Sequence, residues 1–338
     1  MQHSYGTTRE CGKLLDAADK ARFRRDMNLS SAYFEQCIEK YPFCCEVYFR
    51  KSLLYYETDN KILKLRCVRQ AKMCQPNEYF QAICDGYEEE IMGRLESAIE
   101  HFEKATRLTN SNFYHNNRYE AFFKLAFINM NMKRYEQAIT TYLLAIEENE
   151  TSAQLRPHIS ALCYNNIGCC YQELDNLGTA HEYYQRAIAL YQSYILPRRN
   201  VVDIYNQLGR YDAVIKESKK ILKDVDDNYT TKLTLMDIVD ANLHLNKFKS
   251  TKKICERLKR EFPSEYYAYL VESDIEQDVY KRIQIIDEGL SKVREHQGIS
   301  ELLLTRSDLF EATGQTEKAN QDLILAQAIE SGMLGRCD

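Results

Sequence analysis

Three segments of the chain repeat one pattern: RLESAIEHFEKA at residues 94–105, RYEQAITTYLLA at 134–145 and LGTAHEYYQRA at 177–187. Each segment contains an alanine, an aromatic residue four positions after it and a second alanine three positions after the aromatic residue. Spacings of three and four residues put these side chains on one face of an α-helix. The sets are Ala98, Phe102 and Ala105; Ala138, Tyr142 and Ala145; and Ala180, Tyr184 and Ala187.

A second helix fits before each of these segments, and it carries a small residue at one shared position. That residue is Gly86, Ala126 or Gly168. The prolines give the period, because Pro42 and Pro76 are 34 residues apart and each follows an amphipathic segment, at residues 30–41 and 62–75. The chain is therefore predicted to consist of helix–turn–helix units of about 34 residues.

This combination of period, residue size and order resembles the tetratricopeptide repeat (TPR) family. The resemblance implies an all-α, right-handed superhelical solenoid of about nine repeats over residues 11–330, strongest at 79–194, with a short extension at 1–10 and a tail at 331–338. Extra helical turns are expected near 110–118 and 147–158. Lys64, Thr251 and Arg282 depart from the pattern, since a small residue is usual there. The repeats are predicted to begin near Cys11, Cys45, Tyr79, Tyr119, Ala161, Ile195, Lys232, Pro263 and Ser300.

Composition excludes several classes of protein. With 44% hydrophobic residues the 338-residue chain can bury a large core, so it is not a disordered chain. Its net charge of −5 disfavours a nucleic-acid binder, which would show a basic excess. No signal peptide or membrane-length apolar run is found, which predicts a cytoplasmic location, with nucleus or cilium left open.

Motifs for catalysis, metals and cofactors were sought without success. There is no glycine-rich phosphate loop, and His181-Glu182 is followed by Tyr-Tyr-Gln instead of completing a zinc-protease motif. No Cys-x-x-Cys pair occurs among the 12 cysteines. We therefore predict a non-enzyme that holds no cofactor and no metal. Cys37, Cys163, Cys170 and Cys255 are interpreted as buried thiols rather than zinc ligands.

The candidate binding residues follow from the resemblance to TPR proteins. In that family the first helix of each repeat lines a concave groove, and one position commonly holds an asparagine that clamps a peptide backbone. A side-chain amide can donate to a peptide carbonyl and accept from its N–H at once. A solvated polar surface is the alternative. The predicted groove residues are Arg50, Lys124, Asn165, Asn166, Arg199, Asn200, Asp203 and Asp237.

These features together predict an adaptor or scaffold. Its groove would bind an extended peptide or a helix of a protein partner, as one subunit of a multiprotein complex. The alternative is a regulatory subunit, whose solenoid changes conformation when a ligand binds and thereby controls an associated enzyme.

The last predicted helix, at residues 316–330, suggests a second contact surface. Leu323, Ile324 and Leu325 are consecutive, and at 3.6 residues per turn they cannot all face one neighbouring helix. We expect part of this helix to be covered by a second copy of the chain or by a partner subunit. A small exposed patch that the protein tolerates is the alternative.

Overall fold

The structure is a computed structural model that describes residues 9–23, 26–55, 60–108, 118–151 and 156–332. These residues form the α-helices α1–α18 and no strand. The chain divides into two compact units, residues 1–201 and 202–338, and helix α11 (Leu196–Gln207) crosses the division. Each unit is an all-α, TPR-like solenoid.

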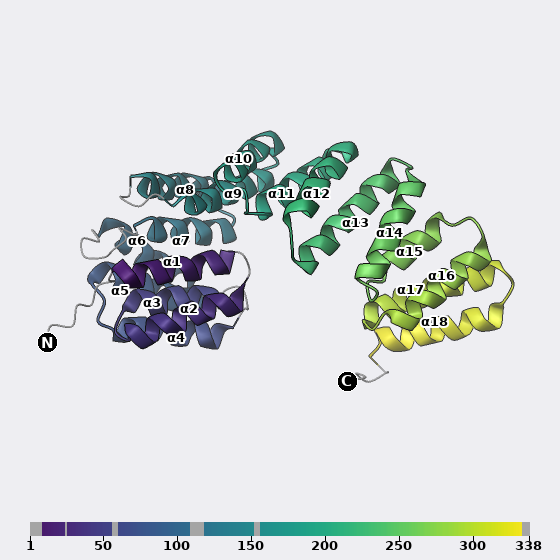
Figure 1. The fold of residues 1–338 in the computed structure, drawn as a ribbon, viewed down its shortest axis with the longest axis horizontal. Coiled ribbons are helices and arrows are strands. Elements are labelled where there is room, and N and C mark those ends of the chain that lie inside the picture. Colours follow the sequence, from purple (N-terminus) through teal and green to yellow (C-terminus); the bar gives the residue numbers. More distant parts are fainter. Residues whose placement is uncertain (1–8, 24–25, 56–59, 109–117, 152–155, 333–338) are drawn as a thin grey trace. The chain divides into compact units, whose positions relative to one another are not determined.

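Unit 1 is a stack of helix pairs in which each helix from α1 to α9 packs against the next along the chain (Figure 1). The first helices of neighbouring pairs are also in contact: α1 contacts α3, and α7 contacts α9. The helices are α1 (Arg9–Phe23), α2 (Met27–Lys40), α3 (Cys45–Leu54), α4 (Lys61–Met73), α5 (Glu78–Ile91), α6 (Leu95–Arg107), α7 (Arg118–Asn131), α8 (Tyr135–Glu150), α9 (Pro157–Glu173), α10 (Leu177–Leu190) and the first half of α11.

The repeated small and aromatic residues interlock where two helices of a pair cross. A Cβ atom added to Gly168 would lie 2.5 Å from the ring of Tyr184, and one added to Gly86 would lie 2.8 Å from the ring of Phe102. Both rings are fully buried. Because a Cβ atom would overlap the buried ring at these two crossings, both positions favour glycine. The predicted packing role of these positions is confirmed.

Local sequence signals set where the helices begin and end. The segment predicted at 30–41 forms α2, which starts earlier because the Asp26 side chain accepts the Leu29 N–H at 3.0 Å. The segment predicted at 62–75 forms α4, which ends before Gln75, whose φ of 51° is incompatible with a helix. Pro157 occupies the first turn of α9, where its missing N–H costs little.

One of the two predicted helix extensions lies among the residues that the structure describes. Helix α8 has 16 residues and α9 has 17, which agrees with lengthening near residues 147–158. Of the extension predicted at 110–118, only Arg118 lies among the described residues, where it begins α7.

Unit 2 continues with the second half of α11 and seven further described helices. Its core residues include Leu235, Cys255 and Leu258 in one cluster and Tyr269, Ile286 and Leu302 in another. The helices are α12 (Tyr211–Asp224), α13 (Asn228–His244), α14 (Phe248–Glu261), α15 (Tyr267–Ile275), α16 (Val279–Lys292), α17 (His296–Ala312) and α18 (Thr316–Glu330).

The three departures from the repeat pattern do not interrupt the helices. Thr251 is fully buried, and its hydroxyl donates to the Lys247 carbonyl at 3.2 Å. Arg282 forms an ion pair with Asp274 at 3.2 Å. Lys64 is only 7% exposed. A polar side chain at the close contact is therefore accommodated in α4, α14 and α16.

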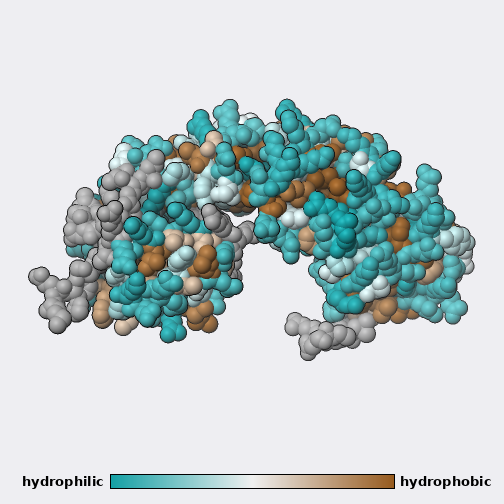
Figure 2. All heavy atoms as spheres, in the orientation of Figure 1, coloured by the Kyte–Doolittle hydropathy of each residue, from teal (hydrophilic) through white to brown (hydrophobic). Residues whose placement is uncertain are grey.

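The final helix has the predicted bounds, Thr316–Glu330. Its buried residues are Ala319, Asp322 and Ala326, while Ile324 is 66% exposed. Figure 2 shows the visible surface as mostly hydrophilic with scattered hydrophobic patches. Within the described parts of the chain, no helix combines the length and hydrophobicity needed to cross a membrane.

Candidate functional site

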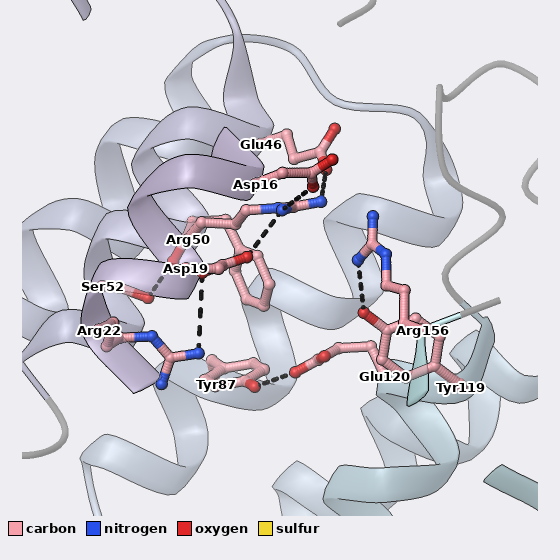
Figure 3. Close-up of polar contacts among 11 residues, drawn as sticks. Asp16, Asp19, Arg22, Glu46, Arg50, Ser52, Tyr87, Tyr119, Glu120 and Arg156 are labelled. Carbon is pink, nitrogen blue, oxygen red and sulfur yellow. Dashed lines mark hydrogen bonds and ion pairs between the residues drawn. The ribbon is translucent and has the colours of Figure 1, made fainter. Parts of the chain in front are cut away.

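The first helices of unit 1 bring together a network of charged side chains around Arg50 of α3. One guanidinium nitrogen of Arg50 donates to Asp19 of α1 at 2.8 Å, and the other donates to Glu46 at 2.6 Å. Figure 3 shows these groups facing one another, with Asp16 beside them at 3.6 Å from Arg50. The Arg50 side chain is only 5% exposed, so carboxylates of its own chain balance its positive charge.

The network shifts the pKa values of its members. Burial alone would raise the pKa of the Asp19 carboxyl, but the positive charges of Arg50 and Arg22 outweigh this effect and lower it. Burial raises the pKa of the Glu120 carboxyl, although that group accepts a hydrogen bond from the Tyr87 hydroxyl. The charged state of Asp19, whose side chain is 15% exposed, therefore depends on its arginine partners.

Lys124 of α7 is also paired within unit 1. Its ammonium nitrogen lies 3.0 and 3.1 Å from the two carboxylate oxygens of Glu90 on α5 and 4.3 Å from the ring centre of Tyr87. The residue is 5% exposed. A partner peptide could engage Arg50 or Lys124 only in competition with these internal contacts. Their role in peptide binding stays a prediction.

Three of the predicted groove residues, by contrast, form one connected row of amides on α9 and α11. The Asn200 Nδ2 donates to Asn165 Oδ1 at 2.9 Å, and Asn165 Nδ2 donates to Asn166 Oδ1 at 3.3 Å. Asn166 Nδ2 in turn donates to the Tyr142 hydroxyl of α8 at 3.0 Å. Asn165 is 1% exposed, whereas Asn166 and Asn200 are partly exposed. We call Asn165, Asn166 and Asn200 the amide row.

Cys169 lies against the amide row and was missed by the sequence analysis. Its sulfur is 3.7 Å from Asn200 Nδ2, 3.9 Å from Asn165 Nδ2 and 3.4 Å from the Tyr184 hydroxyl oxygen. The Tyr184 hydroxyl also lies 2.8 Å from Gln172 Oε1, an ordinary distance for an O–H donor. The sequence marked Tyr184 and Tyr142 as packing residues, but the reach of their hydroxyls depends on the tertiary structure.

Three further predicted groove residues lie on α11 and α13. Arg199 lies next to Asn200 on α11 and is partly exposed. In unit 2, Asp203 lies on α11 and Asp237 on α13, and both are partly exposed. Near Asp237, the Tyr267 hydroxyl of α15 donates to the carboxylate of Asp240. The groove roles of Arg199, Asp203 and Asp237 also stay predictions.

The cysteines interpreted as buried thiols are buried. Cys37, Cys163, Cys170 and Cys255 are each 0% exposed. Burial raises the pKa of Cys170 and of Cys255 to about 12, so both thiols are protonated at neutral pH and are poor nucleophiles and metal ligands. Over the part of the chain that the structure describes, no group of three or more His, Cys, Asp or Glu side chains could hold a metal ion.

The tetratricopeptide repeat family matches this sequence in two places, residues 86–112 and 117–193. These ranges contain all three copies of the alanine–aromatic–alanine pattern. These two stretches are tetratricopeptide repeats. No curated protein matches the sequence of this TPR protein.

Solved structures share the fold at low sequence identity. A subunit chain of the APC/C hetero-tetramer Cut9–Hcn1 is similar over 86% of this TPR protein and 54% of that chain, with 17% identity and a TM-score of 0.56. An IFIT1 monomeric mutant with m7Gppp-AAAA is similar over 90% and 68%, with 16% identity and a TM-score of 0.50. A tetratricopeptide repeat protein from Parabacteroides merdae ATCC 43184 is similar over 75% and 94%, with 17% identity and a TM-score of 0.49. At such identities the likeness concerns the fold alone.

Proposed function

We propose that this TPR protein is a non-catalytic scaffold that binds an extended segment of a protein partner along the amide row. The TPR fold supports a protein-interaction scaffold in general terms. The observation that carries the specific site is the row itself, because Asn165 on α9 is hydrogen-bonded both to its neighbour Asn166 and to Asn200 on α11. Asn166 and Asn200 are partly exposed at this surface.

The chemistry of the row suits a peptide backbone better than a charged side chain. Each amide carries two donor hydrogens and an acceptor oxygen, so capacity remains after the internal bonds are counted. The internal bonds set the orientation of each amide before a ligand arrives, which lowers the entropy cost of binding. Arg199, next to Asn200 in the sequence, is proposed to attract carboxylates of the partner.

A double substitution tests the proposal. Asn166→Ala with Asn200→Ala should weaken binding of the partner by about tenfold, because each lost hydrogen bond is worth about 0.5–1.5 kcal/mol. Partners would be captured from the native cell with the full chain, and the affinity of each would then be measured with purified protein. The control, Asn131→Ala with Gln137→Ala, removes two exposed amides from α7 and α8.

Stability must be measured with binding, because Asn200 also satisfies the buried Asn165. A folded double variant that binds the captured partners as tightly as the wild type would contradict the proposed site. Loss of binding in the control as well would show that the effect is not specific to the amide row.

A further inference from the structure

Helices α12 and α14 of unit 2 present basic side chains on their outer surfaces. Both helices pack against α13 (Figure 1), and an ion pair of 2.8 Å between Asp212 and Lys247 joins their beginnings. The buried residues of each helix are three and four positions apart, so they share one face. At 3.6 residues per turn the opposite, exposed face holds the basic residues. They are Lys216, Lys219 and Lys223 on α12 and Lys249, Lys253 and Arg260 on α14, and we call them the basic face.

The lysines of the basic face have no counter-charge within the protein. None of them forms an ion pair with a residue that the structure describes, and the description is unbroken from residue 156 to 332, around both helices. Arg260 lies 3.6 Å from Glu261. The acidic side chains on the same surface are Glu256 and Asp212, and Asp212 is already paired with Lys247. The basic face therefore keeps an excess of positive charge.

This excess is concentrated on two helices of an acidic chain. The whole protein has a net charge of −5, whereas α14 carries six basic residues against two acidic ones. Lys219 and Lys223 are four positions apart, as are Lys249 and Lys253, and like charges at that spacing destabilise a helix. An anionic partner relieves this repulsion, and the local positive potential attracts such a partner.

The other side chains of the two helices distinguish among anionic partners. Surfaces that bind single-stranded nucleic acids interleave basic residues with aromatic rings that stack on bases. Helices that bind membranes add apolar side chains that enter the lipid. The basic face of α12 and α14, both fully described, has neither feature. Phe248 is 50% exposed, but the helical period places it away from this face, and the Tyr211 ring is already stacked 4.2 Å from the ring of His244.

The dimensions of the basic face suit a short extended segment of protein. From Lys249 to Arg260, α14 rises by about 16 Å at 1.5 Å per residue. An extended chain covers this length with about five residues, and its alternate side chains point to the same side. Acidic residues at every second position would therefore all face the lysines. Lysine pairs with a carboxylate as a point charge and needs no fixed geometry.

We propose that the basic face binds a segment of a protein partner that is rich in aspartate and glutamate. The lysines form surface ion pairs with the carboxylates of this segment, so binding weakens as salt is added. Recognition here depends on side-chain charge, whereas the amide row is proposed to recognise a peptide backbone. The two proposals are independent of each other.

The test uses the full-length protein and a short, fluorescently labelled peptide of alternating glutamate and serine. Fluorescence anisotropy measures its affinity at low salt and at about 0.15 M ionic strength. The same peptide with glutamine in place of glutamate is the uncharged probe, and it should not bind. The variant Lys216→Gln, Lys223→Gln, Lys253→Gln should bind the acidic peptide about tenfold more weakly, since each exposed ion pair contributes a factor of about two or more.

A second triple variant is the matched control. Lys13→Gln, Lys20→Gln, Lys104→Gln removes the same charge from exposed positions on α1 and α6 of unit 1, and it should bind the peptide like the wild type. Glutamine and lysine have similar helix propensities, so both variants should fold, which circular dichroism checks.

Three results with the acidic peptide overturn the proposal: no binding to the wild type at low salt, equal affinity of the Lys216/Lys223/Lys253 variant and the wild type, or equal weakening in the control. A single-stranded RNA and vesicles that contain phosphatidylserine test the other anionic partners. If either binds more tightly than the acidic peptide and the Lys216/Lys223/Lys253 variant loses that binding, the basic face serves nucleic acid or membrane and the proposal is wrong.

Discussion

Asn200 donates a hydrogen bond of 2.9 Å to Asn165, a residue 35 positions earlier in the chain and on the preceding first helix. The bond joins two successive repeats through their inner polar side chains. It also supplies a donor to the side-chain oxygen of Asn165, which is 1% exposed, in place of water. Two neighbouring repeats are thus linked by a polar contact as well as by their hydrophobic core.

The close contact between Gly168 and Tyr184 predicts a large effect of one methyl group. Gly168→Ala should lower the free energy of unfolding by about 1–3 kcal/mol, because its Cβ would overlap the Tyr184 ring and force the helices apart. Urea denaturation followed by circular dichroism measures this change.

Gly178 of α10 provides the matched control for that substitution. A Cβ there would meet no atom within 4 Å, and its φ is not in the left-handed region. Gly178→Ala should therefore leave stability unchanged or raise it by up to about 1 kcal/mol, through helix propensity alone. Equal effects of the two substitutions would contradict the packing described for Gly168.

The ion pair between Asp19 and Arg50 predicts a pH-dependent contribution to stability. The folded-state pKa of Asp19 is lowered, so its stabilising effect is present above the unfolded pKa of about 3.9 and is lost as the pH falls through the folded value. Asp19→Asn should be less stable than the wild type by about 1–3 kcal/mol at pH 7. The difference should shrink steadily as the pH is lowered below about 4.

Denaturation midpoints at several pH values measure this difference. Asp212→Asn is the control, because Asp212 is 78% exposed in its pair with Lys247 and such pairs contribute about 1 kcal/mol or less. A constant difference between Asp19→Asn and the wild type from neutral to acidic pH would show that the Asp19 charge does not stabilise the fold.

The exposed apolar side chains of α18 predict association of the chain. Ile324 is 66% exposed and Leu325 is 43% exposed, and Figure 2 shows hydrophobic surface in the region of this helix. If a second copy covers them, light scattering should show a dimer that Ile324→Glu with Leu325→Glu converts to a monomer. If a partner subunit covers them, the variant should lose that partner. If the wild type is monomeric and the variant keeps every partner, the prediction that another chain covers α18 is wrong.

The departures from the repeat pattern show how far sequence reasoning extends. Lys64 and Thr251 depart from the repeat pattern, since a small residue is usual at these positions. The helices nevertheless form there: the Thr251 hydroxyl donates to a carbonyl of its own helix, and Lys64 is accommodated at 7% exposure. Such local compensation depends on neighbouring atoms that a repeat pattern does not specify.

The sequence by itself determined the TPR fold of this protein, because helix periodicity and the small–aromatic–small pattern act over distances of one to four residues. It also indicated the polar residues of the first helices. Only the tertiary structure decided which of these side chains are paired with charged residues of the same chain. Arg50 pairs with Asp19, and Lys124 pairs with Glu90, across 31 and 34 residues of chain. Asn166 and Asn200 remain partly exposed. Pairings of this kind depend on how far each repeat rotates against the next, and that rotation is a property of the packed core as a whole.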